Sequence, residues 1–262
     1  MLDGTRTEAA FDRATVLTYA VLLVIAAAAW AQVVWSAAAP DAMAGMDMPM
    51  TPTLGDSLVF VAAWAVMMAA MMLPSALPMI GLYAATQRSA ADLVGRAVPV
   101  ALFALVYLGL WAATGVPIYF VSVALGAVAA PTLAYGVAGV LLIAGIFQLS
   151  PLKQVCLRGC RSPLGFLLSH WRPGWRGGLT MGWAHAVYCL GCCWALMVVL
   201  IAAGSMGLAW VLLVAVAVTS EKLLPRGEWI ARAIGAALVL LGVVVAVRPD
   251  LAIALRAGGH SM

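Results

Sequence analysis

The spacing of charged residues limits what this chain can fold into more than any other feature. Five long stretches contain no Asp, Glu, Lys or Arg: 14–40, 57–87, 97–152, 177–220 and 233–247. A membrane-spanning helix needs about 20 mostly apolar residues, so these stretches hold one, one, two, two and one helices, respectively. The sequence therefore predicts seven spans near 17–38, 57–83, 97–122, 129–149, 179–203, 207–224 and 229–247.

Composition agrees with this interpretation and excludes several protein classes. Hydrophobic residues make up 65% of the 262, charged residues make up 9%, and the mean hydropathy is +1.07. Soluble domains are far less apolar and far more charged, so a soluble enzyme, a disordered chain and a nucleic-acid-binding domain are all excluded. We expect an all-α, polytopic transmembrane bundle that forms one domain over 1–262, has the lipid bilayer as a partner and binds no nucleic acid.

The distribution of basic residues predicts an orientation. If the seven spans are correct, twelve of the 14 Lys and Arg residues fall on one side of the membrane. The positive-inside rule makes that side cytoplasmic, with the N-terminus inside and the C-terminus outside. We expect a multi-pass protein of the bacterial cytoplasmic (inner) membrane, with a cytoplasmic N-terminus (1–16), a Met-rich outside loop (40–56) and a basic, Cys-containing inside loop (150–178). The inside loop also carries Leu, Phe and Trp, which favours a segment on the membrane surface or one packed against the bundle.

The strongest chemical motif lies in the span 179–203, which contains MGWAHAVYCLGCCWALM at 181–197. Residues three and four apart share a helix face, which gives one stripe of sulfur and imidazole groups. The members of this stripe are Met181, His185, Cys189, Cys192 or Cys193, and Met197. Such ligands favour copper(I) or zinc, whereas packing is the commoner role for any single Met or Cys. An ionisable His inside a membrane span favours a functional site.

A second set of methionines occupies the span 57–83, just before two prolines in MMAAMMLPSALPM. The set comprises Met67, Met68, Met71 and Met72. Proline frees backbone carbonyls, which is tolerated in membranes where the backbone faces a cavity or other protein. At about 1.5 Å per residue, Met67 should lie level with Cys189, and Met71 level with His185. These methionines are therefore candidate ligands, with helix packing as the alternative.

The outside loop contains DAMAGMDMPM at 41–50. Its four methionines are Met43, Met46, Met48 and Met50. Methionine has little packing reason to cluster in an aqueous loop, and thioethers bind copper(I) without losing a proton. This pattern predicts metal capture, with a loop that dips into the membrane interface as the alternative.

Two further features lie on the predicted cytoplasmic side. Cys156 and Cys160 form CLRGC among basic residues, which should lower the pKa of both thiols and make them reactive or able to accept metal, alone or with His170. Packing is an equal alternative for these residues. We interpret Glu221 and Lys222 as an ion pair marking the membrane interface, with a proton- or metal-partner role for Glu221 as the alternative.

The chain resembles a bacterial family of predicted metal-binding integral membrane proteins that is still described as a domain of unknown function. The motifs that carry this resemblance are CLRGC at 156–160, HAVYCLGCCW at 185–194, EKLLP at 221–225 and AMMLPSALPM at 70–79. They extend the resemblance over roughly 56–247. It implies a polytopic membrane protein that binds metal through its Cys and His residues. The matching positions are Cys156, Cys160, His185, Cys189, Cys192 and Cys193, with Glu221 as a further matching residue.

Three functions remain open from sequence. The first is handling of copper(I), with zinc as an alternative ion, for transport, delivery or homeostasis, together with a periplasmic or cytoplasmic metallochaperone or a membrane partner protein. The second is thiol-disulfide exchange, because Cys189 and Cys192 have redox spacing. The third is a structural subunit of a membrane complex. Phosphate-loop, HExxH, nucleophile-elbow and dinucleotide motifs are all missing, which favours a role other than catalysis.

Overall fold

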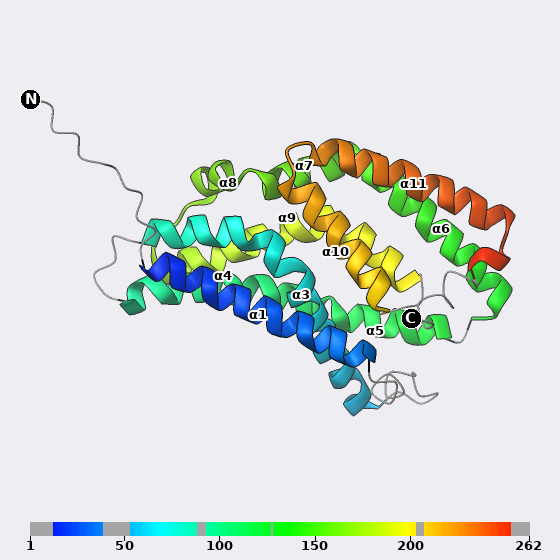
Figure 1. Cartoon of the computed structure of the whole chain (residues 1–262), viewed down its shortest axis with the longest axis horizontal. Coiled ribbons are helices and arrows are strands. Elements are labelled where there is room, and N and C mark those ends of the chain that lie inside the picture. The colour runs from blue at the N-terminus through cyan, green and yellow to red at the C-terminus, as the bar shows by residue number, and fades with distance from the viewer. Residues whose placement is uncertain (1–12, 39–52, 88–92, 127, 203–206, 253–262) are drawn as a thin grey trace, which may run out of the picture.

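The computed structural model describes residues 13–38, 53–87, 93–126, 128–202 and 207–252, and over these residues the chain is helical with no strand. The helices are α1 (Arg13–Ala38), α3 (Leu54–Thr86), α4 (Leu93–Ala113), α5 (Gly115–Gly126), α6 (Ala130–Leu149), α7 (Pro151–Arg161), α8 (Pro163–His170), α9 (Gly174–Ala202), α10 (Leu208–Leu223) and α11 (Gly227–Val247). Figure 1 shows them as an elongated bundle in which most helices run along the long axis. The prediction of an all-α bundle is confirmed. The outer-loop residues Met43, Met46, Met48 and Met50 lie outside the described part of the chain.

Among the described residues, six helical stretches are long and apolar enough to cross a membrane: 15–38, 54–86, 94–126, 132–149, 174–202 and 227–247. They make the chain a membrane protein. The predicted sixth span, 207–224, coincides with α10, which has only 16 residues. One predicted span, 97–122, consists of α4 and α5, which meet at Thr114. A count of seven spans and the direction of insertion stay predictions.

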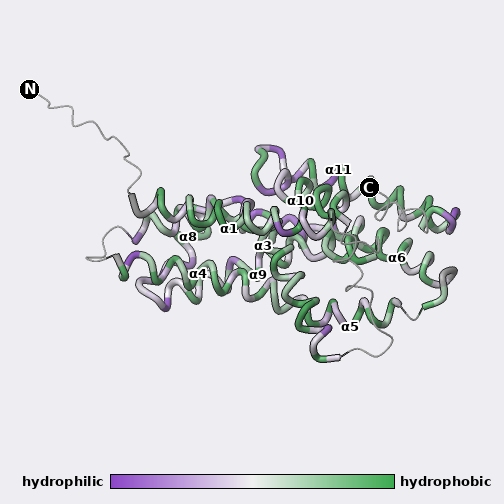
Figure 2. The backbone as a smooth tube through the Cα atoms, turned by 60° about the horizontal axis from the view of Figure 1, so that its bottom comes forward, coloured by the Kyte–Doolittle hydropathy of each residue, from purple (hydrophilic) through white to green (hydrophobic). Residues whose placement is uncertain are grey.

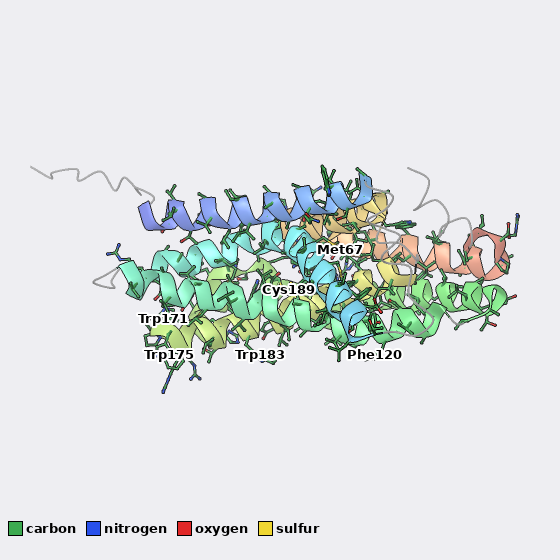
Figure 3. The ribbon with its side chains drawn as sticks, turned by 90° about the horizontal axis from the view of Figure 1, so that it is seen from below. Met67, Phe120, Trp171, Trp175, Trp183 and Cys189 are labelled. Carbon is green, nitrogen blue, oxygen red and sulfur yellow. The ribbon has the colours of Figure 1, made fainter. Side chains whose placement is uncertain are left out.

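The outer surface of the bundle is apolar, as lipid contact requires. Large hydrophobic side chains such as Val24, Leu240 and Val247 are about two-thirds exposed or more. Figure 2 shows hydrophobic residues along most of each long helix. In Figure 3, Trp183 and Phe120 lie along an outer edge, whereas Cys189 lies in the interior. Because water would oppose such exposure, this surface suits a hydrocarbon environment.

Glycines bring two helix pairs close together. A Cβ placed on Gly182 of α9 would come within 2.7 Å of the Phe103 carbonyl oxygen of α4, and one on Gly145 of α6 within 2.8 Å of the Gly235 carbonyl oxygen of α11. Small residues let helices approach in this way within membranes. The α4–α9 contact is the one that matters for the site below, because it brings α4 side chains against the cysteine-bearing part of α9.

Helix α3 begins with a capping box, in which the side chains of Thr53 and Asp56 each accept a hydrogen bond from the other residue's backbone N–H. Pro74 and Pro78 lie within the helix. Proline removes a backbone donor and crowds the preceding turn, and Figure 1 shows α3 changing direction along its length. The bent helix contacts α1, α4 and α10.

The segment 150–178, predicted as the inside loop, is mostly helical. Ser150 caps α7 by accepting a hydrogen bond from the Lys153 N–H, and Pro151 occupies the first turn, where its missing donor has no cost. Helix α7 packs against α9, with Leu157 fully buried. Of the two sequence interpretations for this segment, packing against the bundle holds for α7, whereas Trp171 and Trp175 beyond α8 are half exposed (Figure 3).

Candidate metal centre

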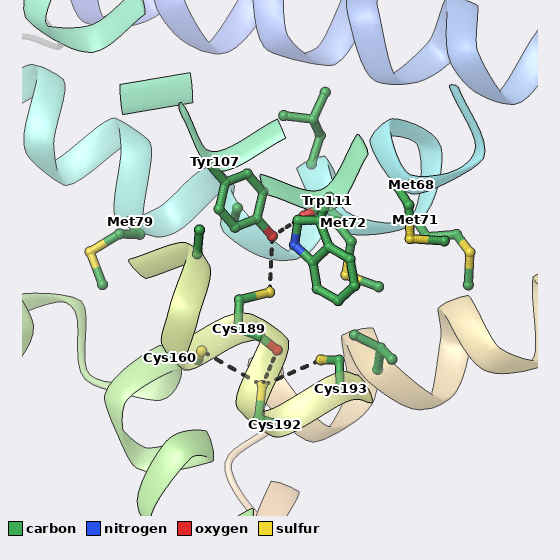
Figure 4. Packing of buried hydrophobic residues seen from close by; sticks show 14 of the residues in the cluster. Met68, Met71, Met72, Met79, Tyr107, Trp111, Cys160, Cys189, Cys192 and Cys193 are labelled. Atoms are coloured by element: carbon green, nitrogen blue, oxygen red, sulfur yellow. Dashed lines mark hydrogen bonds between the residues drawn. The ribbon is translucent and has the colours of Figure 1, made fainter. Parts of the chain in front are cut away.

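Four thiols meet in the interior of the bundle. Helix α9 contributes Cys189, Cys192 and Cys193, and α7 contributes Cys160 (Figure 4). The Cys192 sulfur lies 3.7 Å from the Cys160 sulfur and 3.3 Å from the Cys193 sulfur. The Cys192 thiol also donates to the Cys189 carbonyl oxygen at 3.2 Å, and all four cysteines belong to one buried cluster. All four are free thiols, and at most 9% of any of them is exposed. The cluster therefore joins two sequence motifs that lie about 30 residues apart.

Lys222 of α10 reaches this cluster. Its ammonium nitrogen lies 2.9 Å from the Cys189 sulfur and 3.2 Å from the Ser75 hydroxyl of α3. From α4, the Tyr107 hydroxyl lies 3.1 Å from the same sulfur and 3.4 Å from the Met72 carbonyl oxygen. Cys189 is thus contacted by one positive charge and one hydroxyl, which are the groups that stabilise a negatively charged sulfur.

A second polar network lies beside the thiols. The Lys153 ammonium group of α7 binds a Glu221 carboxylate oxygen at 2.6 Å and also donates to the Cys192 carbonyl oxygen. The Gln148 side chain of α6 donates to the other Glu221 oxygen at 2.7 Å. These contacts tie together α6, α7, α9 and α10 at the level of the cysteines. Because Lys153 and Glu221 carry opposite charges, the pair adds no net charge to the interior.

The interpretation of Glu221 and Lys222 as a pair marking the membrane interface is wrong. Only 1% of Glu221 and 7% of Lys222 is exposed, and the two side chains have different partners. Successive helical residues point about 100° apart, which turns Glu221 toward Lys153 and Lys222 toward Cys189. Glu221 is near the thiols, although its direct partners are a lysine and a glutamine.

The other members of the α9 stripe are also buried. Met181 and Met197 are at most 2% exposed, and His185 is 2% exposed. The His185 ring packs against aromatic rings of two helices: its centroid lies 5.4 Å from Tyr107 and 5.8 Å from Phe103, both of α4, and 5.6 Å from Phe166 of α8. Its Nδ1 atom is buried and has no hydrogen-bond partner among the described residues. The His185 imidazole is therefore available as a metal ligand or as a contact for a metal ion that moves toward Cys189.

The four methionines of α3 belong to the same buried cluster as the cysteines. Met67, Met68, Met71 and Met72 are at most 4% exposed. Figure 4 shows Met72 on the side of α3 near Tyr107 and Trp111, with Met68 and Met71 farther along the helix. Helix α3 is linked to Cys189 indirectly, because the Met72 carbonyl oxygen contacts Tyr107 and the Ser75 hydroxyl contacts Lys222. This part of α3 lies five to eight residues beyond Met67, the position expected from depth alone.

The two cysteines of α7 differ in their surroundings. Cys160 lies in the thiol cluster, whereas Cys156 is partly exposed and makes none of the sulfur contacts of that cluster. The expectation that basic neighbours lower the pKa of both thiols is wrong. Burial raises the pKa of Cys156 against the opposing effect of Lys153, and interaction with Cys189 raises the pKa of Cys160. His170 stacks on Phe166 and contacts the Ser169 hydroxyl, apart from the thiols.

The donor set fits a soft ion bound by few ligands. Over the described residues, no three His, Cys, Asp or Glu side chains are arranged as a ready site for a metal. Two sulfurs about 2.3 Å from one ion subtend about 107° when 3.7 Å apart and about 92° when 3.3 Å apart. The Cys160–Cys192 separation therefore suits two ligands of a three- or four-coordinate ion, and a linear two-thiolate copper(I) needs these sulfurs roughly a further 1 Å apart. Copper(I) accepts two thiolates, whereas structural zinc requires four ligands.

Comparison with known proteins identifies the family of this chain. A family model described as PpoB2, copper chaperone, matches residues 61–245, which cover most of α3, all of α4 to α10 and nearly all of α11. The chain belongs to this copper chaperone family. The match agrees with the metal-related family expected from the sequence, and the matched region contains every residue of the thiol cluster. No curated protein and no solved structure matches the chain.

Several residues around the thiols were missed from sequence. Tyr107 and Gln148 lie in apolar stretches with no motif, so only the packing of α4 and α6 reveals them. Lys153 looked like one of several loop charges. Lys222 did carry a signal, because an ionisable residue at the end of a span is by default a candidate for function. The interpretation of Glu221 and Lys222 as a pair at the membrane interface left this possible role of Lys222 unrecognised.

Proposed function

We propose that this protein is a membrane-embedded copper chaperone that binds copper(I) through thiols of the cluster formed by Cys160, Cys189, Cys192 and Cys193. The observation that carries the proposal is the convergence of these thiols, from α7 and α9, in an interior that also holds the lysine at Cys189. A buried ammonium group beside four thiols is costly to maintain for packing alone. Soft sulfur ligands favour copper(I) and zinc over harder ions such as magnesium and calcium, and membership of a family described as copper chaperone favours copper.

Methionine residues supply a route to these thiols in the proposed mechanism. Met43, Met46, Met48 and Met50 capture copper(I) on the outside, the methionines of α3 hold it at intermediate depth, and the cysteines receive it. Successive sulfur sites of similar softness exchange the ion without an energy source, so a concentration difference or an acceptor drives transfer. The burial of Met67, Met68, Met71 and Met72 in one cluster with the cysteines supports this route.

The proposed location is the bacterial cytoplasmic membrane, with the basic loops inside. The distribution of Lys and Arg supports this orientation, which places α7 and α8 on the cytoplasmic side. Cys160 lies on the segment nearest that side. The proposed partner is therefore a copper-binding protein with exposed thiols that docks at the cytoplasmic end of the bundle.

An anaerobic copper(I) titration of the detergent-purified protein tests the proposal. A chromophoric copper(I) chelator serves as competitor, and bound copper is read from the loss of chelator colour. We expect one tightly held copper(I) per chain, because the four thiols lie in one buried cluster. Zinc added in the same assay should leave the bound copper in place. A protein that takes no copper from a weak chelator would contradict the proposal.

A further inference from the structure

Within the part of the chain that the structure describes, the interior of the bundle contains a positive charge that no carboxylate balances. Among the described residues, three charged side chains are buried, excluding histidine: Lys153, Glu221 and Lys222. The first two neutralise each other across 2.6 Å. Lys222 has no carboxylate within ion-pair distance in the described part of the chain, and its contacts are the Cys189 sulfur and the Ser75 hydroxyl. A lone buried ammonium group is expensive, so its presence next to the thiols needs a reason.

We infer that Lys222 is the built-in counter-ion of the loaded metal site and makes the site select monovalent thiophilic cations. The inference rests on the proposed function. Copper(I) bound by two thiolates carries a charge of −1, and Lys222 brings the sum to zero. In a low-dielectric interior, this neutral combination is strongly favoured over any combination that leaves one charge uncompensated.

A divalent ion fails the same charge balance. Zinc bound by two thiolates is neutral and leaves Lys222 uncompensated, whereas zinc bound by four thiolates leaves an excess negative charge. Three thiolates would balance the charge. However, over the described residues, no three His, Cys, Asp or Glu side chains are arranged as such a site. The arrangement of the described side chains therefore limits the site to two thiolate ligands. With two thiolates, the fixed charge of Lys222 favours an ion of charge +1.

Lys222→Met tests this charge balance, with copper(I), silver(I) and zinc as probes in chelator competitions on the full-length protein in detergent. Removing one partner of a buried charge pair costs enough to lower affinity about 100-fold. We therefore expect copper(I) and silver(I) affinities to fall by about that factor while zinc affinity stays level or rises. Silver(I) is larger than copper(I) but has the same charge, so parallel losses would identify charge rather than size as the selected property.

Two variants control for structural damage. Lys222→Arg keeps the charge and should keep the preference for monovalent ions. Ser75→Ala removes only the other hydrogen-bond partner of Lys222, and should leave the copper-to-zinc preference near that of the native protein. Lys222→Gln, a polar neutral replacement, should behave like Lys222→Met if the methionine variant does not fold.

The outcomes separate the inference from the proposed function. Native protein that binds no copper(I) would contradict the proposed function itself. Native protein that binds copper(I), together with neutral Lys222 variants that keep the native copper-to-zinc preference, would overturn the counter-ion inference alone. A Lys222→Arg variant that loses the preference as fully as Lys222→Met would also overturn it, because charge would then not be the property that matters.

Discussion

Copper(I) binding is expected to be lost when Cys189 and Cys192 are both replaced by serine. Cys192 is the centre of the cluster, within 3.7 Å of two other sulfurs, and Cys189 is the thiol in contact with Lys222 and Tyr107. Serine keeps the size of the side chain but replaces a soft ligand with a hard one. Loss of supporting groups around a metal already costs about 10–100-fold in affinity, so loss of two ligands should exceed about 1,000-fold.

Cys156→Ser provides the matched control for this experiment. Cys156 undergoes the same chemical change on a neighbouring helix, but its thiol is partly exposed and outside the sulfur cluster. We expect this variant to bind copper(I) as the native protein does, measured by chelator competition and by metal content after gel filtration. Equal copper content in the double variant and the native protein would show that these cysteines are not ligands.

Replacing Lys153 by methionine is expected to lower the free energy of unfolding by about 3–5 kcal/mol, because it leaves the Glu221 carboxylate buried without its cation. The Lys153 side chain is fully buried, and Glu221 is 1% exposed, so water gives little compensation. The same change removes the bond from Lys153 to the Cys192 carbonyl oxygen and loosens α7 from α9. Unfolding by sodium dodecyl sulfate in mixed micelles, followed by circular dichroism, measures the effect.

A second substitution in the same chain separates charge from packing. Glu221→Gln, added to Lys153→Met, removes the unpaired carboxylate and leaves an amide that can still bond to Gln148. We expect this double variant to recover most of the lost stability. Arg158→Met is the surface control, because Arg158 pairs with Glu228 in an exposed position and its loss should change stability little. A Lys153→Met variant as stable as the native protein would show that the buried pair does not hold α7 in place.

The general architecture could be predicted from the spacing of charges, and the details of the site could not. Long apolar stretches predict helices, because a backbone in hydrocarbon must satisfy its own hydrogen bonds, as a helix does. Five of the predicted spans therefore agree with single helices that are long and apolar enough to cross a membrane. The break at Thr114 was missed because the stretch 97–122 is uniformly apolar. In this stretch, Thr114 accepts a hydrogen bond from Trp64 of α3 at 3.0 Å, a partner that lies 50 residues away.

The thiol cluster could likewise be predicted from the sequence only in part. Helical spacing placed Cys189 on the stripe with His185, and all members of the stripe are buried. The approach of Cys160 depends on the packing of α7 beneath α9, which no local pattern encodes. Burial also reversed the expected influence of basic neighbours on the α7 thiols, because desolvation and thiol contacts outweighed the positive charges.

X-ray absorption at the copper edge, on copper(I)-loaded protein grown with selenomethionine, tests the central claim most directly. Selenium replaces the sulfur of every methionine, so the only sulfur atoms left in the protein are those of the five cysteines. We expect a first shell containing sulfur at about 2.3 Å and no selenium. A first shell made of selenium, or of nitrogen and oxygen without sulfur, would contradict copper binding by the thiol cluster.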